Sequence, residues 1–300
     1  MTAPGDLLHR FLFERLPVRG HLVRLDASWR AAIEHHAYPD AVAAALGEAM
    51  AASALMAGAL KFEGRLSLQF EGPGPVRLML AQCTHRHAIR GVARHDESLV
   101  EPPPEGGLFG AGQLAVTIEQ SEGTDRYQGV VPLESPRLSD NLEQYFARSE
   151  QLPSRLMLAA TRDRAAGLLL QRVALGDAGT VAEIAEADDA WRRIGLLAAT
   201  VTARELLDMP CRELLRRLFR EDDIRLFEGT PVFFQCSCSR ERVAGILQAL
   251  GGEEVDALLR ERGDVEVRCE FCNRAWRFDA VDVAGIFSTG APQQAPKGLH

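Results

Sequence analysis

The chain has 300 residues, of which 46% are hydrophobic and 25% are charged, and its formal net charge is −8 at pH 7. This composition is typical of a soluble globular protein with two or so domains and an ample core. The negative charge argues against nucleic acid as an obligate partner, because phosphate binding depends on clustered positive charge.

The N-terminus carries charged residues among its leucines, including Asp6, Arg10 and Glu14, and has no apolar core of a signal peptide. We therefore expect the protein to stay in the cytoplasm, where thiols are kept reduced. In that compartment the six cysteines indicate metal or redox chemistry rather than structural disulfides.

Residues 41–60 could pass for a membrane span, because Glu48 is their one charge. They are dominated by alanine and glycine, however, whereas membrane insertion depends on large apolar side chains. We predict a buried helix with Pro39 at its first turn, and no membrane partner.

From Gly64 to about Arg172 the hydrophobic pattern has period two, which is typical of β-strands. The expected elements are strands near 66–70, 76–83, 114–118, 127–133, 155–161 and 166–173, with a helix near 139–146. Together they predict an α+β fold with a mixed N-terminal domain built on antiparallel sheets with packed helices. No nucleotide-binding loop or nucleophile elbow occurs in the sequence, so we do not expect an enzyme.

Two polar clusters in this region contain residue types found in metal or catalytic sites. Cys83, His85 and His87 alternate along one expected strand, and we interpret them as solvated strand residues rather than metal ligands. The turn at 121–127 offers serine, aspartate and tyrosine, but nothing positions a histidine beside them. No catalytic constellation follows.

Residues 183–228 are dense in charge, with eleven acidic residues and eight arginines. Apolar residues still recur at helical spacing, Thr202 and Glu205 form a capping box, and Pro210 begins the next helix. The pattern predicts short amphipathic helices that persist only when packed on another element. Periodicity alone favours an ordinary helical connector.

Four cysteines near the C-terminus form the strongest motif. Cys236 and Cys238 make a CxC pair, and Cys269 and Cys272 a CxxC pair, with thirty residues between the pairs. Four thiols in two tight pairs suit a tetrahedral all-cysteine zinc site. A purely structural zinc ribbon, an iron–sulfur cluster and a thioredoxin-like dithiol are the alternatives.

The residues around these cysteines predict a small unit. A short strand at 232–234 precedes the first pair, and Ser239 can cap a helix with Val243, Ile246, Leu247 and Leu250 on its inner face. Gly263 ends a second helix, and apolar alternation on both sides of the second pair predicts a hairpin. A domain of about 55 residues often needs a metal for stability.

These residues carry a resemblance to a known family. The runs FQCSCSRERV, LGGEEVDALL, VEVRCEFCN and FDAVDV resemble the redox switch of the bacterial heat-shock protein 33 family, the redox-regulated 33 kDa chaperones. Upstream, VRLMLAQCT, LAVTIEQSEGTDRYQGVVPL and YFARSEQLPSRL resemble the N-terminal domain of that family. The likeness covers about residues 7–287.

The resemblance implies a domain organisation. Residues 1–178 would form the chaperone core domain, 179–231 a metastable helical linker, 232–287 a zinc-binding redox-switch domain, and 288–300 a disordered tail. Within the switch, one Zn²⁺ per chain would be bound by Cys236, Cys238, Cys269 and Cys272 in the reduced, inactive form. On oxidation Cys236 would pair with Cys238 and Cys269 with Cys272, and zinc would be released.

The resemblance also implies a function. Loss of zinc would unfold the linker and expose a surface that binds unfolding or oxidatively damaged proteins, so that the protein prevents their aggregation under oxidative stress without ATP. The oxidised form would be a homodimer. Cys83 and Cys211 fall outside the switch, and we interpret Cys211 as a packing residue.

The cysteine motif is also compatible with two other functions. A zinc-dependent nucleic-acid-binding protein is disfavoured, because residues 231–287 hold ten acidic residues and seven arginines without a basic stripe. A thiol oxidoreductase would require turnover with a dithiol donor.

Overall fold

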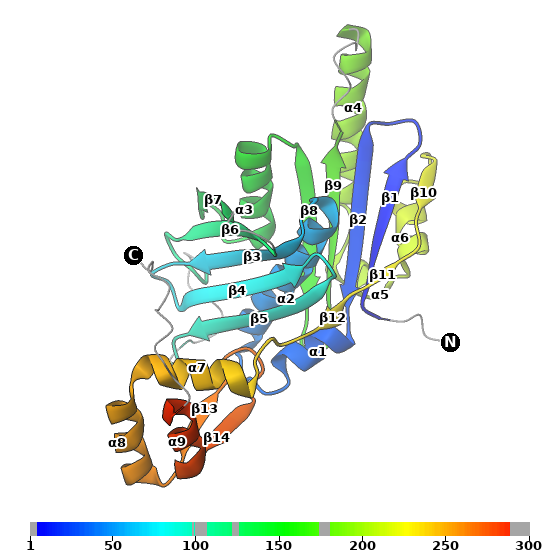
Figure 1. The fold of residues 1–300 in the computed structure, drawn as a ribbon. Coiled ribbons are helices and arrows are strands. Elements are labelled where there is room, and N and C mark those ends of the chain that lie inside the picture. Colours follow the sequence, from blue (N-terminus) through cyan, green and yellow to red (C-terminus); the bar gives the residue numbers. More distant parts are fainter. Residues whose placement is uncertain (1–4, 98, 100–106, 122–125, 174–180, 289–300) are drawn as a thin grey trace. The chain divides into compact units, whose positions relative to one another are not determined.

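The computed structural model describes residues 5–97, 99, 107–121, 126–173 and 181–288. The chain divides into two compact units, Met1–Gln235 and Cys236–His300. Figure 1 shows the elements of both, and each unit is described by itself. Asp125, residues 100–106 and 174–180, and residues 289–300 of the predicted tail lie outside the described residues.

The first unit contains two β-sheets. The first sheet has the order β10-β1-β2-β9-β8, with β11 also paired to β1, and all of its pairs are antiparallel. Its strands are β1 (Leu7–Phe13), β2 (Val18–Leu25), β8 (Ser154–Ala160), β9 (Ala165–Arg172), β10 (Ile224–Leu226) and β11 (Thr230–Pro231).

The second sheet has the order β12-β5-β4-β3-β6-β7. Its strands are β3 (Gly64–Glu71), β4 (Val76–Thr84), β5 (Ala88–His95), β6 (Gln113–Gln120), β7 (Arg126–Pro132) and β12 (Phe233–Phe234). The pairs are antiparallel except that of β12 with β5, which is parallel. The predicted α+β class with antiparallel sheets and packed helices is confirmed.

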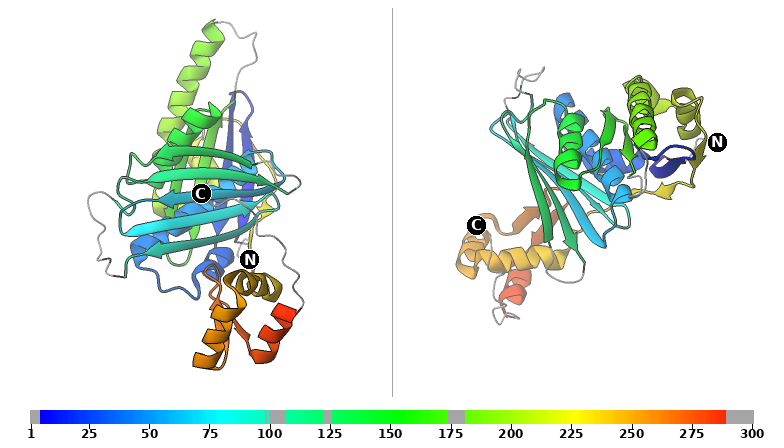
Figure 2. Two further views of the ribbon diagram at one scale, coloured as in Figure 1. Left: turned by 60° about the vertical axis from the view of Figure 1, so that its left-hand side comes forward. Right: turned by 90° about the horizontal axis from the view of Figure 1, so that it is seen from above.

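Helix α2 (Asp40–Ala59) lies between the two sheets (Figures 1 and 2). It is long and apolar enough to cross a membrane, but 78% of its apolar window is buried inside the protein, as predicted. Its small residues allow close packing: a Cβ added at Gly47 would lie 2.6 Å from the Cβ of Ala160. Burial of Glu48 within this helix raises the pKa of its carboxyl to about 7.

Three shorter helical segments complete this core. They are α1 (Ala27–Ile33), α3 (Leu138–Tyr145) and the π-helical turn η1 (Phe146–Glu150). Trp29 of α1 and Tyr145 of α3 are fully buried. Side chains of α1 and α3 thus close the space that α2 and the sheets leave open.

The structure corrects the predicted placement of Cys83, His85 and His87. Its side chain is fully buried in the core around α2, and burial raises the pKa of its thiol. His85 and His87 lie in the turn between β4 and β5 rather than on a strand, and the backbone of His87 has a φ of 62°. The interpretation is therefore wrong for Cys83, which is buried because the inner face of β4 points to α2, and wrong in placing the two histidines on a strand, because β4 ends at Thr84. His85 is exposed, as expected.

The charge-dense segment forms helices α4 (Val181–Ala198), α5 (Ala203–Asp208) and α6 (Cys211–Leu218). They pack on the face of the first sheet opposite to α2 and form a second core. Its buried members include Phe11, Leu22 and Leu168 from the strands and Ile194, Leu206, Leu214 and Leu218 from the helices. The neighbouring strand residues Val23 and Leu169 belong to the first core, as alternation along a strand requires.

Local signals in these helices behave as predicted. The hydroxyl of Thr202 accepts a hydrogen bond from the amide of Glu205 at 3.2 Å, and the Glu205 carboxylate accepts one from the amide of Thr202 at 2.9 Å. Pro210 precedes α6 as its N-cap. Cys211 packs against the second core, and burial raises the pKa of its thiol to about 11.

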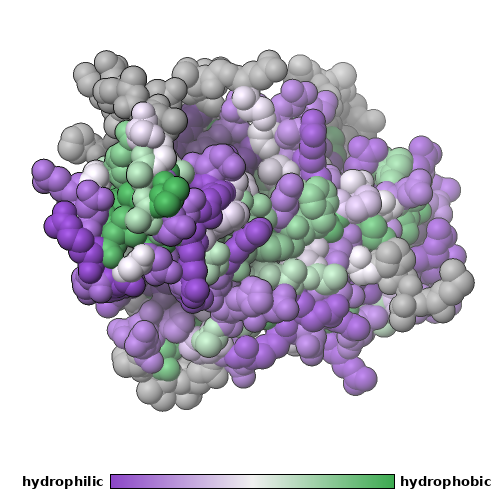
Figure 3. Space-filling view, turned by 60° about the horizontal axis from the view of Figure 1, so that its bottom comes forward, coloured by the Kyte–Doolittle hydropathy of each residue, from purple (hydrophilic) through white to green (hydrophobic). Residues whose placement is uncertain are grey.

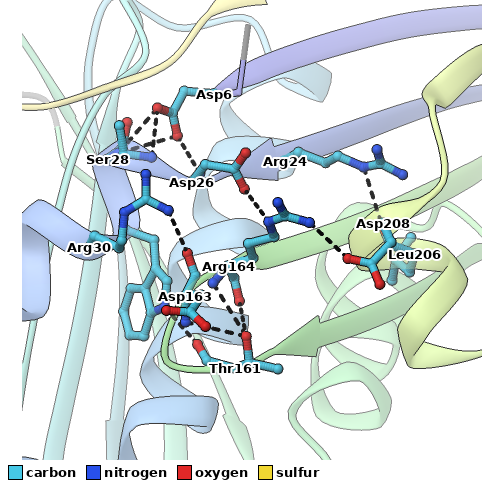
Figure 4. A network of polar contacts seen from close by, with 12 residues as sticks. Asp6, Arg24, Asp26, Ser28, Arg30, Thr161, Asp163, Arg164, Leu206 and Asp208 are labelled. Carbon is cyan, nitrogen blue, oxygen red and sulfur yellow. Dashed lines mark hydrogen bonds and ion pairs between the residues drawn. The ribbon is translucent and has the colours of Figure 1, made fainter. Parts of the chain in front are cut away.

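Polar contacts fasten these helices to the first sheet (Figure 4). Arg24 of β2 donates to the backbone carbonyl of Leu206 at 3.1 Å. Arg164 lies 3.3 Å from a carboxylate oxygen of Asp26 and 2.8 Å from one of Asp208. We call Asp26, Arg164 and Asp208 the Arg164 clasp. It joins α1, the β8–β9 turn and α5.

Asp6 fixes the start of α1. Its carboxylate accepts hydrogen bonds from the amides of Asp26 at 2.6 Å and of Ser28 at 3.1 Å. These amides begin a helix that has no capping side chain of its own, so a residue from before β1 satisfies them. The hydroxyl of Ser28 then donates to the carbonyl of Val232 at 3.2 Å, which holds the segment leading to β12.

The predicted strand at 232–234 is present as β12, with Val232 buried. The amide of Phe233 donates to the carbonyl of His87, and the amide of Gln235 to that of Ile89. The backbone is thus fixed to the second sheet up to the residue before Cys236.

The second unit contains helices α7 (Arg240–Leu250), α8 (Gly252–Arg262) and α9 (Ala280–Ser288) and the hairpin β13 (Val265–Arg268) with β14 (Ala275–Phe278). Its core is small. Among the residues that the structure describes, six apolar ones are buried: Val243, Leu247, Val255, Val265, Phe278 and Val283.

The predicted local features of this unit are confirmed in part. The Ser239 hydroxyl accepts from the amide of Arg242 at 3.3 Å, and Gly263 ends α8 with a φ of 83°. Ile246 and Leu250 were expected to face inward but are 61% and 48% exposed. The unit is too small to cover more than a narrow stripe of α7, so only Val243 and Leu247 are buried.

Candidate metal site

The structure brings all four predicted cysteines together. Cys236 and Cys238 lie on the segment before α7, and Cys269 and Cys272 lie in the turn between β13 and β14. Their sulfur atoms all lie within 4.8 Å of one another. Cys236 Sγ is 3.5 Å from Cys269 Sγ, and Cys238 Sγ is 3.5 Å from Cys272 Sγ.

These separations match a single tetrahedral metal ion. Metal–sulfur bonds of about 2.3 Å place the sulfurs of a tetrahedral site about 3.8 Å apart. They are too long for a disulfide, whose sulfurs lie about 2.05 Å apart, and all six cysteines of the chain are free thiols. The four cysteines could therefore hold a metal ion, and an all-thiolate ligand set suits Zn²⁺ or iron.

The hairpin turn positions the second pair. The amide of Cys269 donates to the carbonyl of Arg274 at 3.0 Å, and the amide of Asn273 donates to the carbonyl of Cys269 at 2.7 Å. Asn273 adopts a left-handed φ of 52°, which asparagine tolerates better than most residues. The CxxC pair thus lies within a β-hairpin and not at a strand-to-helix junction, which disfavours a thioredoxin-like dithiol.

The surroundings of the sulfurs affect their protonation differently. Burial raises the pKa of the Cys236 and Cys272 thiols. Burial also acts to raise the pKa of Cys269. Hydrogen bonds from the backbone amides of Cys272 and Phe271, together with those from the Cys236 and Cys272 thiols, outweigh burial and lower the pKa of that thiol. The four side chains are only half-buried, so small molecules can reach the sulfurs.

Among the described residues, these four cysteines are the one group of three or more metal-ligating side chains with ligand atoms this close. Cys83 and Cys211 belong to the cores of the first unit and do not join them. Ser121 and Tyr127 are described, but Asp125 between them is not.

Sequence reasoning missed three features of the first unit. The Arg164 clasp joins residues that are far apart in the chain, and no local sequence pattern predicts it. His21 is 2% exposed, both of its ring nitrogens lack a hydrogen-bond partner, and burial lowers its pKa to about 4. The third feature is the raised pKa of Glu48. Its position as the one charge in an apolar segment was the signal that could have predicted it.

Comparison with known proteins gives a consistent result. The sequence profile of the family described as "Hsp33 protein" matches residues 6–279. A "33 kDa chaperonin" of Nitrosococcus oceani is 48% identical over 286 residues, which are 94% of this chain and 94% of the relative. One of Methylobacillus flagellatus is 42% identical over 286 residues, 95% of each chain.

A solved structure shares the fold. The crystal structure of a 33 kDa chaperonin from Thermotoga maritima superposes with a TM-score of 0.80 at 24% sequence identity. The match covers 94% of this chain and 98% of the other.

Proposed function

The chain belongs to the Hsp33 family, and from that premise we propose that it is a redox-regulated holdase chaperone that works without ATP. In the reduced form the protein is inactive. Oxidation of the four clustered thiols activates it to bind unfolding proteins and to prevent their aggregation.

The four-cysteine cluster is the observation that supports this proposal most. Cys236, Cys238, Cys269 and Cys272 would hold one Zn²⁺ per chain as thiolates, and thiolates are also the groups that peroxide and hypochlorous acid attack. Bound zinc supplies about 10–16 kcal/mol of apparent folding free energy in small domains. Six buried apolar residues are a small core beside that contribution, so the second unit would depend on its ligands.

Oxidation removes these ligands in pairs. Each disulfide forms from two thiols and one molecule of hydrogen peroxide, which is reduced to two molecules of water. We assign the pairs of the family, Cys236 with Cys238 and Cys269 with Cys272. The sulfurs already lie within 4.8 Å of one another, so either bond needs only a small movement. Such short loops restrain little of the chain and cannot replace the lost metal as a folding constraint.

The helices of the first unit would carry the response. We propose that residues 1–178 are the chaperone core, that 179–231 are a metastable linker, and that 232–287 are the redox switch. Helices α4, α5 and α6 are short and are held by the second core and the polar contacts of Figure 4. When they detach, the apolar side chains of that core become available to clients. The face drawn in Figure 3 is mostly hydrophilic, with smaller apolar areas.

Partners and location follow from the same proposal. Clients would be unfolding or oxidatively damaged proteins, and the oxidised form would be a homodimer. The protein would act in the cytoplasm during oxidative stress. We expect neither enzymatic turnover nor binding to nucleic acid or membranes.

One comparison tests the proposed function. Aggregation of a heat-unfolded client is followed by light scattering in the presence of zinc-loaded reduced protein or of peroxide-treated protein from which zinc has been removed. We expect suppression only by the oxidised form, and its loss after reduction with zinc resupplied. Equal suppression by both forms would show that the cluster does not control activity.

A further inference from the structure

A groove of about 560 Å³ lies between α6 and β10 in the first unit. Its floor is apolar and consists of Leu215 and Phe219, which are buried, and Ile224 and Leu226, which are half-buried. A volume of this size is typical of a binding site for a drug-sized ligand.

Three exposed arginines, Arg212, Arg216 and Arg220, line the same groove. The segment 183–228 contains eight arginines, and five of them form ion pairs with acidic residues. The pairs are Arg192 with Asp189, Arg193 with Asp222, Arg204 with Asp208, Arg217 with Glu205, and Arg225 with Glu14. The remaining three make no hydrogen bond or ion pair within the part of the chain that the structure describes, and all three line the groove.

The two acidic residues of the groove do not neutralise these arginines. Asp222 is bonded by Arg193 at 2.6 Å, and Asp223 lies 3.2 Å from Arg15. Both carboxylates are thus paired with arginines that do not line the groove. The groove therefore has an excess of positive charge in a chain whose net charge is −8.

Two of the three arginines lie on the same helix. Arg212 and Arg216 are one turn apart in α6, about 6 Å along its axis, and Arg220 follows the end of the helix at Leu218. Like charges four residues apart on a helix, such as Arg212 and Arg216, destabilise it. An anion bound between them would remove that cost.

An extended peptide matches both features of the groove. Alternate side chains of a β-strand lie on one side, about 6.5 Å apart, and the intervening ones lie on the other. Two acidic side chains at alternate positions would match the spacing of Arg212 and Arg216, and a third would face Arg220. The apolar residues between them would face Ile224 and Leu226. We propose that this groove binds an extended peptide in which acidic and apolar residues alternate.

Binding itself is independent of the proposed chaperone function. One consequence does rest on that function: a ligand that binds only the folded α6–β10 segment stabilises it by mass action. The peptide would then slow the detachment of the linker and delay activation by oxidant.

The test uses the full-length, zinc-loaded, reduced protein and a fluorescein-labelled peptide with three Leu-Glu repeats. Affinity is measured by fluorescence anisotropy at low and high salt, for wild type and for the triple variant Arg212→Gln, Arg216→Gln and Arg220→Gln. Arg204→Gln is the matched control, because Arg204 lies in the preceding helix α5, is exposed and does not line the groove. A peptide with Gln in place of Glu tests the need for charge.

We expect the triple variant to bind at least about tenfold more weakly, since each lost charge-assisted hydrogen bond is worth more than 1 kcal/mol. The control should bind within about twofold of wild type, and high salt should weaken binding by wild type. Equal affinity of the triple variant and wild type, or equal binding of the Gln peptide, would overturn the proposal. As a second measurement, Arg→Glu at the three positions should select a Leu-Lys peptide over the Leu-Glu peptide, and the opposite preference would also overturn it. If the peptide binds but does not delay activation by oxidant, the proposed binding site is supported and only its coupling to the switch is contradicted.

Discussion

At the scale of single residues, the proposed function makes each clustered thiol necessary for a stable second unit. Cys269→Ser removes one sulfur and should abolish tight zinc binding. Without the metal, the six-residue core should not keep the unit folded. Zinc content per chain, measured by native mass spectrometry, should fall, and limited proteolysis should cut within residues 236–288.

Cys211→Ala is the control for this prediction, because it removes a half-buried thiol of the first unit. That variant should retain zinc and resist proteolysis like the wild type. A Cys269→Ser protein with full zinc content and an intact second unit would contradict the assignment of ligands.

Glu48 gives a second prediction for a single residue. Burial raises the pKa of this carboxyl from 4.5 to about 7 in the folded protein. The folded state therefore binds the proton more tightly, and the resulting stability is present below pH 4.5 and lost as pH rises through 7. Glu48→Gln mimics the protonated form and should stabilise the protein at pH 8 by at most about 3 kcal/mol, with little effect at pH 4.5.

Urea unfolding at these two pH values measures the difference. Glu34→Gln, at an exposed position after α1, should change stability by less than about 0.5 kcal/mol at both. A gain for Glu48→Gln that did not depend on pH would show that the carboxyl is not the cause.

At the scale of elements, the Arg164 clasp holds α5 to the rest of the first unit. Its ion pairs are partly exposed, so together they contribute about 1 kcal/mol. Arg164→Gln should therefore increase the opening of α5 and α6 about fivefold in the reduced protein. Hydrogen exchange of residues 203–218 measures this directly.

The chain offers a close control in Arg162→Gln. Arg162 lies in the same β8–β9 turn and also pairs with an aspartate, Asp40, but it does not contact the helices α4 to α6. It should leave exchange in α5 and α6 unchanged. Equal effects of the two substitutions would indicate a general perturbation of the turn.

The elements also show which parts of the fold could be predicted from the sequence. Features that depend on neighbouring residues were predicted correctly, among them the capping box at Thr202, the cap at Ser239 and the β13–β14 hairpin. The four-thiol cluster was also predicted, because paired cysteines have few alternative roles in a reduced chain.

Contacts between distant segments could not be predicted in this way. The parallel pairing of β12 with β5 joins residues about 145 positions apart, and no local signal specifies it. The burial of Cys83 depends on where α2 lies, and the exposure of Ile246 depends on how little of the second unit covers α7. Hydrophobic periodicity shows which face of a helix or strand is apolar, but it does not show how much of that face the neighbouring elements cover.

At the scale of the whole molecule, the two units have separate cores and should respond differently to oxidation. After peroxide treatment and removal of zinc, hydrogen exchange should become fast in residues 236–288 and in α4, α5 and α6. Strands β3 to β6 and α2 should stay protected, because their core contains neither the cysteine cluster nor these helices.

The outcome for α5 and α6 decides this prediction. Continued protection of both helices after the second unit has unfolded would contradict the proposed coupling between the switch and the linker. Loss of protection throughout β3 to β6 would instead indicate global unfolding.

The pairing of β1 has a consequence for how clients would be held. Strands β10 and β11 pair with the outer edge of β1, and both belong to the proposed linker. If the linker detached, the amide and carbonyl groups of Leu7–Phe13 along that edge would lose their partners. Such groups can hydrogen-bond to any extended backbone that approaches, whatever its side chains are. The activated protein would then present a strand edge that binds polypeptide backbone without sequence preference, next to its exposed apolar surface. Such an edge suits a chaperone that binds many different damaged polypeptides.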